Sequence, residues 1–174
     1  ITGFGRLVLE RYGAEHGPES ALISWSVAKS VLHSLVGLLV RDGKLSTGMR
    51  ADLPAWRAPG DPRASLTLDV LLRMSSGLAW REDYVDAGSS DVIEMLFGRG
   101  KDDVAAYAAE SPLEHVPDTV WCYSSGASNL VSAIAGRAIG RVGSDRLAAG
   151  GYAIAAAGAV GMALAAGAQS YPVL

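Results

Sequence analysis

The sequence has a single cysteine, Cys122, among its 174 residues. One cysteine excludes an internal disulfide framework and any metal site built from several cysteines, and it leaves the redox compartment open. The chain also has no basic surplus, because its 15 lysines and arginines stand against 18 aspartates and glutamates, for a net charge of −3. Without clustered positive charge there is no electrostatic footprint for nucleic acid, and we expect no nucleic-acid partner.

Charge is also absent from the C-terminal part of the chain, where no charged residue follows Arg146. Residues 147–168 are nearly all alanine, glycine and other apolar types, and they meet the length of about 20 residues that a transmembrane helix requires. Their Ala/Gly-rich composition and the lack of a basic flank argue against a membrane span but leave it open. A second hypothesis is that this part is out of frame with the ancestral gene. We therefore separate residues 144–174, as a hydrophobic tail, from a domain over residues 1–143.

The chain begins with Ile1 rather than methionine, and no signal-peptide pattern precedes its first predicted element. We expect it to start inside a longer gene product. Apolar residues at three- and four-residue steps predict a helix over residues 26–40, and Asp42-Gly43 is a typical helix stop. The other expected elements are a strand at 5–11, a loop at 50–65, a helix capped by Thr67 and ending at Met74, helices near 89–97, 102–110 and 125–139, and an extended segment at 119–123.

Ser26 and Lys29 place a hydroxyl and an ammonium three residues apart at the start of the longest apolar helix. This spacing puts both side chains on one helix face, within reach of each other. A serine needs a neighbouring base to become a nucleophile, and a lysine can be that base when its surroundings depress its pKa. The free N–H groups at a helix N-terminus also favour the oxyanion of acyl transfer. The alternative is an ordinary capped helix with a surface lysine.

Tyr123 and Ser125 lie in the loop between the extended segment and the last predicted helix. A phenol can relay a proton between a nucleophile and a leaving group when cationic neighbours lower its pKa, and Ser125 is placed to face the same site. The alternative for Tyr123 is a buried aromatic ring whose hydroxyl finds a partner.

Three blocks of the sequence resemble, in order and spacing, the serine β-lactamase-related and penicillin-binding-protein family. The blocks are Leu22–Leu45 (LISWSVAKSVLHSLVGLLVRDGKL), Leu66–Leu78 (LTLDVLLRMSSGL) and Pro117–Leu130 (PDTVWCYSSGASNL). This family includes class C β-lactamases, D,D-peptidases, β-lactamase-fold esterases and 6-aminohexanoate-dimer hydrolases. The resemblance implies the N-terminal half of a fold that pairs an α/β lobe with an all-helical lobe.

By this resemblance, Ser26 is the acylated nucleophile, Lys29 its base or proton relay, and Tyr123 the catalytic tyrosine of a Tyr-x-Asn/Ser element. The implied activity is a serine hydrolase that forms an acyl-enzyme with small-molecule amide, ester or lactam substrates and needs no cofactor or metal. The competing hypothesis is a catalytically incomplete fragment or a non-catalytic binding module of the same fold. The substrate, the compartment and the oligomeric state do not follow from the sequence.

Further residues resemble one branch of the family. Trp25, the stretch Trp80–Tyr84 (WREDY) and Ser125 within Tyr-Ser-Ser look most like the aminohexanoate-oligomer hydrolases and esterases. In that branch a tyrosine placed like Tyr84 covers bound substrate. The resemblance therefore implies substrate contacts for Tyr84, Ser125 and Trp25.

The resemblance is incomplete on the C-terminal side. Family members have a third element, Lys-Thr-Gly or His-x-Gly, on a late strand whose backbone N–H supplies half of the oxyanion hole, and nothing in this sequence matches it. Most of the family's antiparallel sheet would also follow the block that contains Tyr123. The expected fold is therefore a β-lactamase/transpeptidase-like one that lacks its C-terminal strands.

The three histidines are weaker candidates. His33 lies seven residues after Ser26, about 10 Å along a helix axis, so it cannot bond to Ser26 directly. His16 and His115 lie in loops without acidic residues at metal-ligand spacing, and no Gly-x-Ser-x-Gly elbow is present. We expect packing or surface roles for the histidines and a packed, unreactive Cys122.

Overall fold

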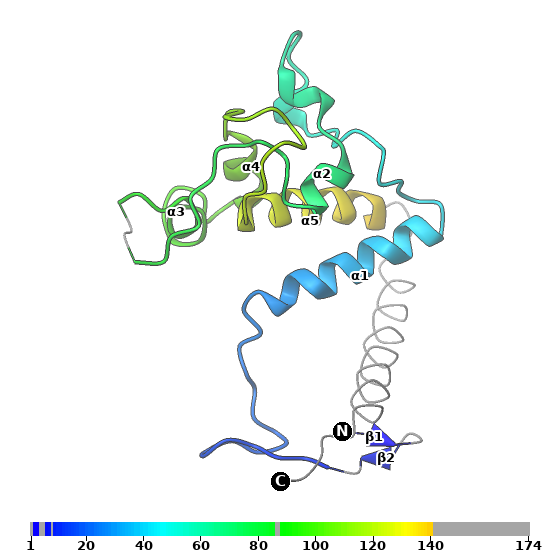
Figure 1. Cartoon of the computed structure of the whole chain (residues 1–174), viewed down its shortest axis with the longest axis vertical. Coiled ribbons are helices and arrows are strands. Elements are labelled where there is room, and N and C mark those ends of the chain that lie inside the picture. Colours follow the sequence, from blue (N-terminus) through cyan, green and yellow to red (C-terminus); the bar gives the residue numbers. More distant parts are fainter. Residues whose placement is uncertain (1, 4–5, 8, 86–87, 141–174) are drawn as a thin grey trace. The chain divides into compact units, whose positions relative to one another are not determined.

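The computed structural model describes residues 2–3, 6–7, 9–85 and 88–140 (Figure 1). The chain divides into two compact units, whose described parts lie within residues 2–31 and within residues 32–140. In the first unit, β1 (Thr2–Gly3) pairs with β2 (Arg6–Leu7) as an antiparallel ribbon. The strand predicted over residues 5–11 is wrong in its extent, since residues 9–11 lie outside any strand. A strand extends only as far as its neighbour supplies hydrogen-bond partners, and β1 supplies two residues.

Helix α1 (Val27–Arg41) confirms the helix predicted over residues 26–40. Val36 and Leu39 are 2% exposed, so the C-terminal half of the helix contributes to the core of the second unit. The helix ends where Gly43 adopts a φ of +67°, a conformation that glycine reaches at no steric cost. The N–H of Lys44 then bonds to the carbonyl of Leu39 (2.7 Å). The predicted stop at Asp42-Gly43 is confirmed.

Four further α-helices belong to the second unit, and their boundaries lie within two residues of the predicted ones. They are α2 (Leu68–Leu72), α3 (Asp91–Phe97), α4 (Val104–Ala109) and α5 (Ser125–Gly140), with two 3-10 turns, η1 (Pro54–Trp56) and η2 (Pro62–Ser65), in the predicted loop. Side-chain oxygens of Thr67, Ser90, Asp103 and Ser124 cap the four α-helices. These caps satisfy N–H groups that have no partner inside the helix, which explains why the helices begin where they do.

Helix α5 is the centre of this unit, because α2, α3 and α4 all pack on it (Figure 1). Its buried side chains recur at three- and four-residue steps, from Ala127 through Leu130 and Ile134 to Ala138. Leu130 meets a core in which Leu68 and Leu71 of α2 are also completely buried. Removing such a side chain from water is worth roughly 1.5–3 kcal/mol, so this face supplies much of the folding free energy.

The loop after α2 positions the segment that leads into α5. Gly77 has a φ of +75°, and a Cβ there would lie 2.2 Å from the carbonyl oxygen of His115. The N–H of Asp118 bonds to the carbonyl of Ser75 (2.8 Å), and the N–H of Cys122 bonds to that of Met74 (2.8 Å). The segment predicted to be extended, residues 119–123, is thus held near the end of α2 by isolated hydrogen bonds. It forms no strand.

The family fold is only partly represented in the described residues. Their sheet structure is limited to the β1–β2 ribbon and two isolated bridges, so the antiparallel sheet of an α/β lobe stays a prediction. The predicted tail at 144–174 lies outside the described residues. Within the part of the chain that the structure describes, no helix is both long and apolar enough to span a membrane.

The first turn of α5 packs closely against the indole of Trp80. A Cβ on Gly126 would lie 2.5 Å from Cζ3 of Trp80, and the Trp80 side chain is itself almost fully buried. Position 126 therefore admits only glycine while Trp80 keeps its place.

We predict that Gly126→Ala lowers the free energy of unfolding by about 1–3 kcal/mol, because the methyl group overpacks a rigid site. The matched control is Gly136→Ala on the same helix, where a new Cβ meets no atom within 4 Å. That variant should gain about 0.5–1 kcal/mol from helix propensity. Urea denaturation of both variants checks the pair, and equal effects would contradict the close packing at Gly126.

Candidate active site

The structure brings Ser26 and Lys29 together, as their spacing predicts. Lys29 Nζ donates a hydrogen bond to Ser26 Oγ at 3.2 Å. Ser26 stands immediately before α1 and is exposed, whereas Lys29 is half-buried. The same N···O contact allows the reverse transfer, from the serine hydroxyl to a neutral amine, so the pair can act as nucleophile and base.

The backbone at this helix start corrects one expectation. The N–H groups of Val27, Ala28 and Lys29 bond to the carbonyls of the residues three positions earlier, at 3.0, 3.1 and 3.0 Å. They are therefore already engaged and are not open donors for an oxyanion. The partial positive charge of the helix terminus remains, since it arises from the aligned peptide dipoles of α1.

Trp25 enters this helix start with a φ of +43°, and its side chain is 74% exposed. A residue with a Cβ rarely adopts this conformation, and backbone strain of this kind clusters at functional sites. The predicted substrate contact at Trp25 stays a prediction.

A second group of predicted site residues gathers around the carboxylate of Glu82, in the second unit. Glu82 Oε2 accepts hydrogen bonds from Trp80 Nε1 (2.5 Å) and from the backbone N–H of Ser125 (2.8 Å). Glu82 Oε1 accepts from the hydroxyl of Tyr84 (2.7 Å) and from Ser125 Oγ. The structure thus brings Tyr84 and Ser125 together, through a carboxylate that bonds to both.

Tyr123 is half-buried and lies just before this cluster in the chain. The next residue, Ser124, caps α5 through its Oγ, which accepts from the N–H of Ala127 (2.9 Å). Tyr123 is two residues from Ser125, which bonds to Glu82 through both its backbone N–H and its hydroxyl. Tyr84 and Ser125 therefore share one hydrogen-bonded cluster within the second unit, and Tyr123 lies next to it in the chain.

The hydrogen bonds around Glu82 set its charge. Burial alone would raise the pKa of Glu82, but the bonds from Ser125, Tyr84 and Trp80 outweigh it and hold the pKa below its usual value. Burial, followed by the hydrogen bond to Glu82 and its negative charge, raises the pKa of Tyr84. At neutral pH Glu82 is consequently ionised, and Tyr84 keeps its proton.

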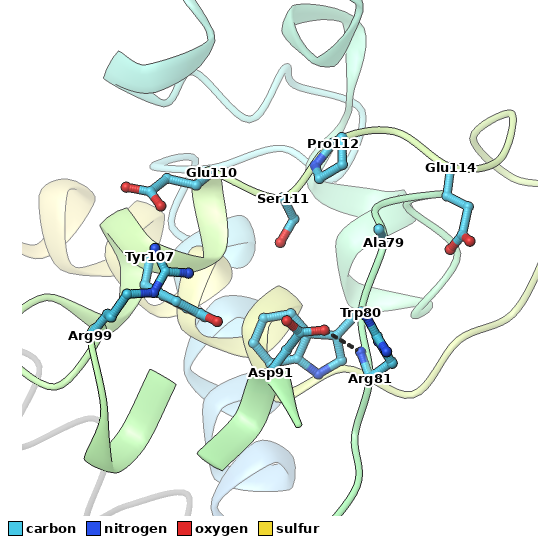
Figure 2. A pocket seen from close by; sticks show the side chains of 10 residues that line it. All are labelled: Ala79, Trp80, Arg81, Asp91, Arg99, Tyr107, Glu110, Ser111, Pro112 and Glu114. Carbon is cyan, nitrogen blue, oxygen red and sulfur yellow. Dashed lines mark hydrogen bonds between the residues drawn. The ribbon is translucent and has the colours of Figure 1, made fainter. Parts of the chain in front are cut away.

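A cavity is lined in part by Trp80 (Figure 2). It has a volume of about 660 Å³, and Tyr107, Arg99 and Asp91 contribute to its wall. The guanidinium of Arg99 stacks over the Tyr107 ring at 5.2 Å, and the N–H of Arg81 bonds to Asp91 Oδ2 (2.7 Å). The predicted catalytic and contact residues are absent from its lining.

The remaining candidates occupy ordinary positions. His16, His33 and His115 are exposed, in agreement with surface roles. Burial, with the nearby carboxylates of Glu114 and Glu82, raises the pKa of the Cys122 thiol, which disfavours the reactive thiolate. Among the residues that the structure describes, no group of three or more His, Cys, Asp or Glu side chains is placed to hold a metal ion.

Comparison with known proteins assigns the family. The sequence model of the Beta-lactamase family matches residues 1–147, most of the chain. The chain belongs to the beta-lactamase family. The resemblance in its three sequence blocks is thereby confirmed, and with it a general serine-hydrolase chemistry on a small-molecule substrate. The comparison with curated proteins gives no match.

Within this member of the beta-lactamase family, Glu82 is the site residue that the sequence predictions missed. The stretch Trp80–Tyr84 had been noted for its resemblance, yet only Tyr84 was assigned a role. A usable signal was present, because alternate residues of an extended segment face the same side, which groups Trp80, Glu82 and Tyr84. The partner at Ser125 gave no such signal, since it is 43 residues away in the sequence.

We predict that Glu82→Gln lowers the free energy of unfolding at pH 7 by about 1–2 kcal/mol, because an amide has one accepting oxygen in place of two and its NH2 group cannot accept the remaining hydrogen bonds. A carboxyl whose folded-state pKa is depressed stabilises the fold above its unfolded pKa and loses that contribution as the pH falls through the folded pKa. The difference from wild type should therefore shrink below pH 4.5, the reference value for Glu82.

Urea denaturation at pH 7 and at successively lower pH measures this difference. Glu19→Gln, a matched change at an exposed glutamate, is the control and should have no effect. A loss of stability in Glu82→Gln that is equal at all pH values would contradict the role of the charge.

Proposed function

We propose that this chain is a serine hydrolase that forms an acyl-enzyme on Ser26 with an amide, ester or lactam substrate. The observation that carries the proposal is the 3.2 Å contact between Lys29 Nζ and Ser26 Oγ at the start of α1. Membership of the beta-lactamase family supports it, since that family is one of serine hydrolases. Within the family, the resemblance of the WREDY and Tyr-Ser-Ser stretches favours the 6-aminohexanoate-dimer hydrolase and esterase branch.

The proposed reaction begins as Ser26 Oγ attacks the substrate carbonyl and its proton moves to a neutral Lys29. The C–O bond to the enzyme forms, and the bond to the leaving group breaks once Tyr123 delivers a proton to that group. Water then attacks the acyl carbon, the bond to Ser26 Oγ breaks, and the acid is released. One proton of the water returns to Ser26, and Lys29 passes its proton to Tyr123, so that all three groups regain their starting states. The proposal assigns substrate contacts to Tyr84, Ser125 and Trp25, and the hydrolase domain to residues 1–143, with residues 144–174 as a separate tail.

We predict that a fluorophosphonate probe adds covalently to Ser26, because such probes require only an activated serine and a leaving fluoride. Intact-mass measurement and peptide mapping should place one adduct on Ser26 and none in Ser26→Ala. Ser34→Ala, two turns further along α1, is the control and should label like wild type. A folded wild type without an adduct would favour the competing hypothesis, a non-catalytic binding module.

We predict that Lys29→Arg slows labelling of Ser26 by about 10²–10⁴-fold, the usual contribution of a general base. Arginine keeps the positive charge and a hydrogen bond to Ser26, but it does not release its proton at working pH. The rate constant for labelling, followed by mass increment over time, measures the effect. A near wild-type rate in Lys29→Arg would show that position 29 acts through its charge alone.

A further inference from the structure

Glu82 has no acceptor capacity left for substrate. A carboxylate offers about four lone-pair positions, and donors from Trp80, Tyr84 and Ser125 fill all four. This arrangement disfavours Glu82 as a general base or as a partner for a substrate cation, and it favours a role in orienting its neighbours.

The segment containing Tyr123 is held at both ends, and Glu82 supplies one of the two anchors. On the N-terminal side, the N–H of Cys122 bonds to the carbonyl of Met74 (2.8 Å). On the C-terminal side, Ser125 bonds to Glu82 through both its backbone N–H and its hydroxyl. The backbone at Tyr123 is therefore restrained on both sides while Glu82 keeps its bonds.

The same carboxylate also binds the hydroxyl of Tyr84. The Tyr84 hydroxyl donates to Glu82 Oε1 at 2.7 Å, although the Tyr84 side chain is 55% exposed. Glu82 itself is fixed by the indole of Trp80, which is packed against Gly126. One anchored carboxylate thus binds the phenol of Tyr84 and fixes the backbone two residues after Tyr123.

We infer that Glu82 is a positioning residue, which holds Tyr123 and Tyr84 in place for proton delivery to the leaving group. The inference rests on the proposed function, because it takes Tyr123 as the group that protonates the leaving atom. It concerns only reactions in which that atom must gain a proton.

In acylation by a lactam, the bond from Ser26 to the carbonyl carbon forms, the C–N bond breaks, and nitrogen takes up the proton. In labelling by a fluorophosphonate, fluoride leaves without one.

The test compares these two reactions on the full chain. Glu82→Gln should slow acylation of Ser26 by a penicillin-type lactam by about 10²-fold, the effect of a misplacement near 1 Å. Labelling by the fluorophosphonate should stay within about twofold of wild type, since the attack needs only Ser26 and Lys29. Glu82→Asp, which keeps the charge on a shorter side chain, should restore part of the lactam rate. Glu19→Gln, at an exposed loop position, should match wild type in both reactions.

A second set of measurements tests whether Glu82 acts through the hydroxyls of Tyr84 and Ser125. In a background that lacks both hydroxyls, Tyr84→Phe with Ser125→Ala, the further change Glu82→Gln should alter the lactam rate much less than in wild type, because residues that act as a unit are not additive. The indole N–H resonance of Trp80 in a proton–nitrogen NMR spectrum should also move in Glu82→Gln. The resonance of Trp56 is the internal control, since its indole bonds to the carbonyl of Ala109 instead.

Each outcome decides between the two proposals. Selective loss of the lactam reaction, with partial recovery in Glu82→Asp and a shifted Trp80 resonance, supports the role of Glu82. Equal losses in both reactions, unchanged rates, or an unmoved Trp80 resonance overturn it and leave Ser26 as nucleophile. A wild type that reacts with the fluorophosphonate but not with the lactam overturns it as well. A wild type that reacts with neither probe overturns the proposed function and, with it, this inference.

Discussion

The close contact between Trp80 and the first turn of α5 is the constraint on which the second unit depends. The indole occupies space that any side chain on Gly126 would take, so the helix start and the preceding loop fit together in one way only. From this position the Trp80 N–H holds Glu82, and Glu82 holds Ser125 at the beginning of the same helix. Packing and hydrogen bonding thus form one connected set of contacts around the residues that follow Tyr123.

Electrostatic interactions stabilise this set of contacts around Glu82. A carboxylate near a helix N-terminus interacts favourably with the aligned peptide dipoles, and here it also satisfies an N–H of the first turn. Desolvation opposes the charge of Glu82, but its donors overcome this and keep the group ionised. The half-buried negative charge of Glu82 therefore has a structural role. Its hydrogen bonds orient the hydroxyls of Tyr84 and Ser125.

The two groups of candidate residues are built in different ways. The contact between Ser26 and Lys29 is local, since three residues of helix bring the side chains together whatever the rest of the chain does. The cluster around Glu82 joins two segments 43 residues apart, and it exists only because α5 and the Trp80 segment pack on each other. Substitutions in the first group therefore test chemistry, whereas substitutions in the second group test how folding positions its residues.

The sequence by itself determined the local features of this protein. The periodicity of α1, the glycine stop after it, the cap at Thr67 and the pairing of Ser26 with Lys29 all depend on residues within one or two helical turns, where spacing dictates geometry. Three ordered sequence blocks also sufficed for the family. Only the tertiary structure decided that β2 stops at Leu7, that the N–H groups at the start of α1 are engaged, and that Glu82 binds Ser125. The physical reason is that tertiary packing determines which groups remote in sequence can form hydrogen bonds. Periodicity and spacing along the chain do not predict that packing.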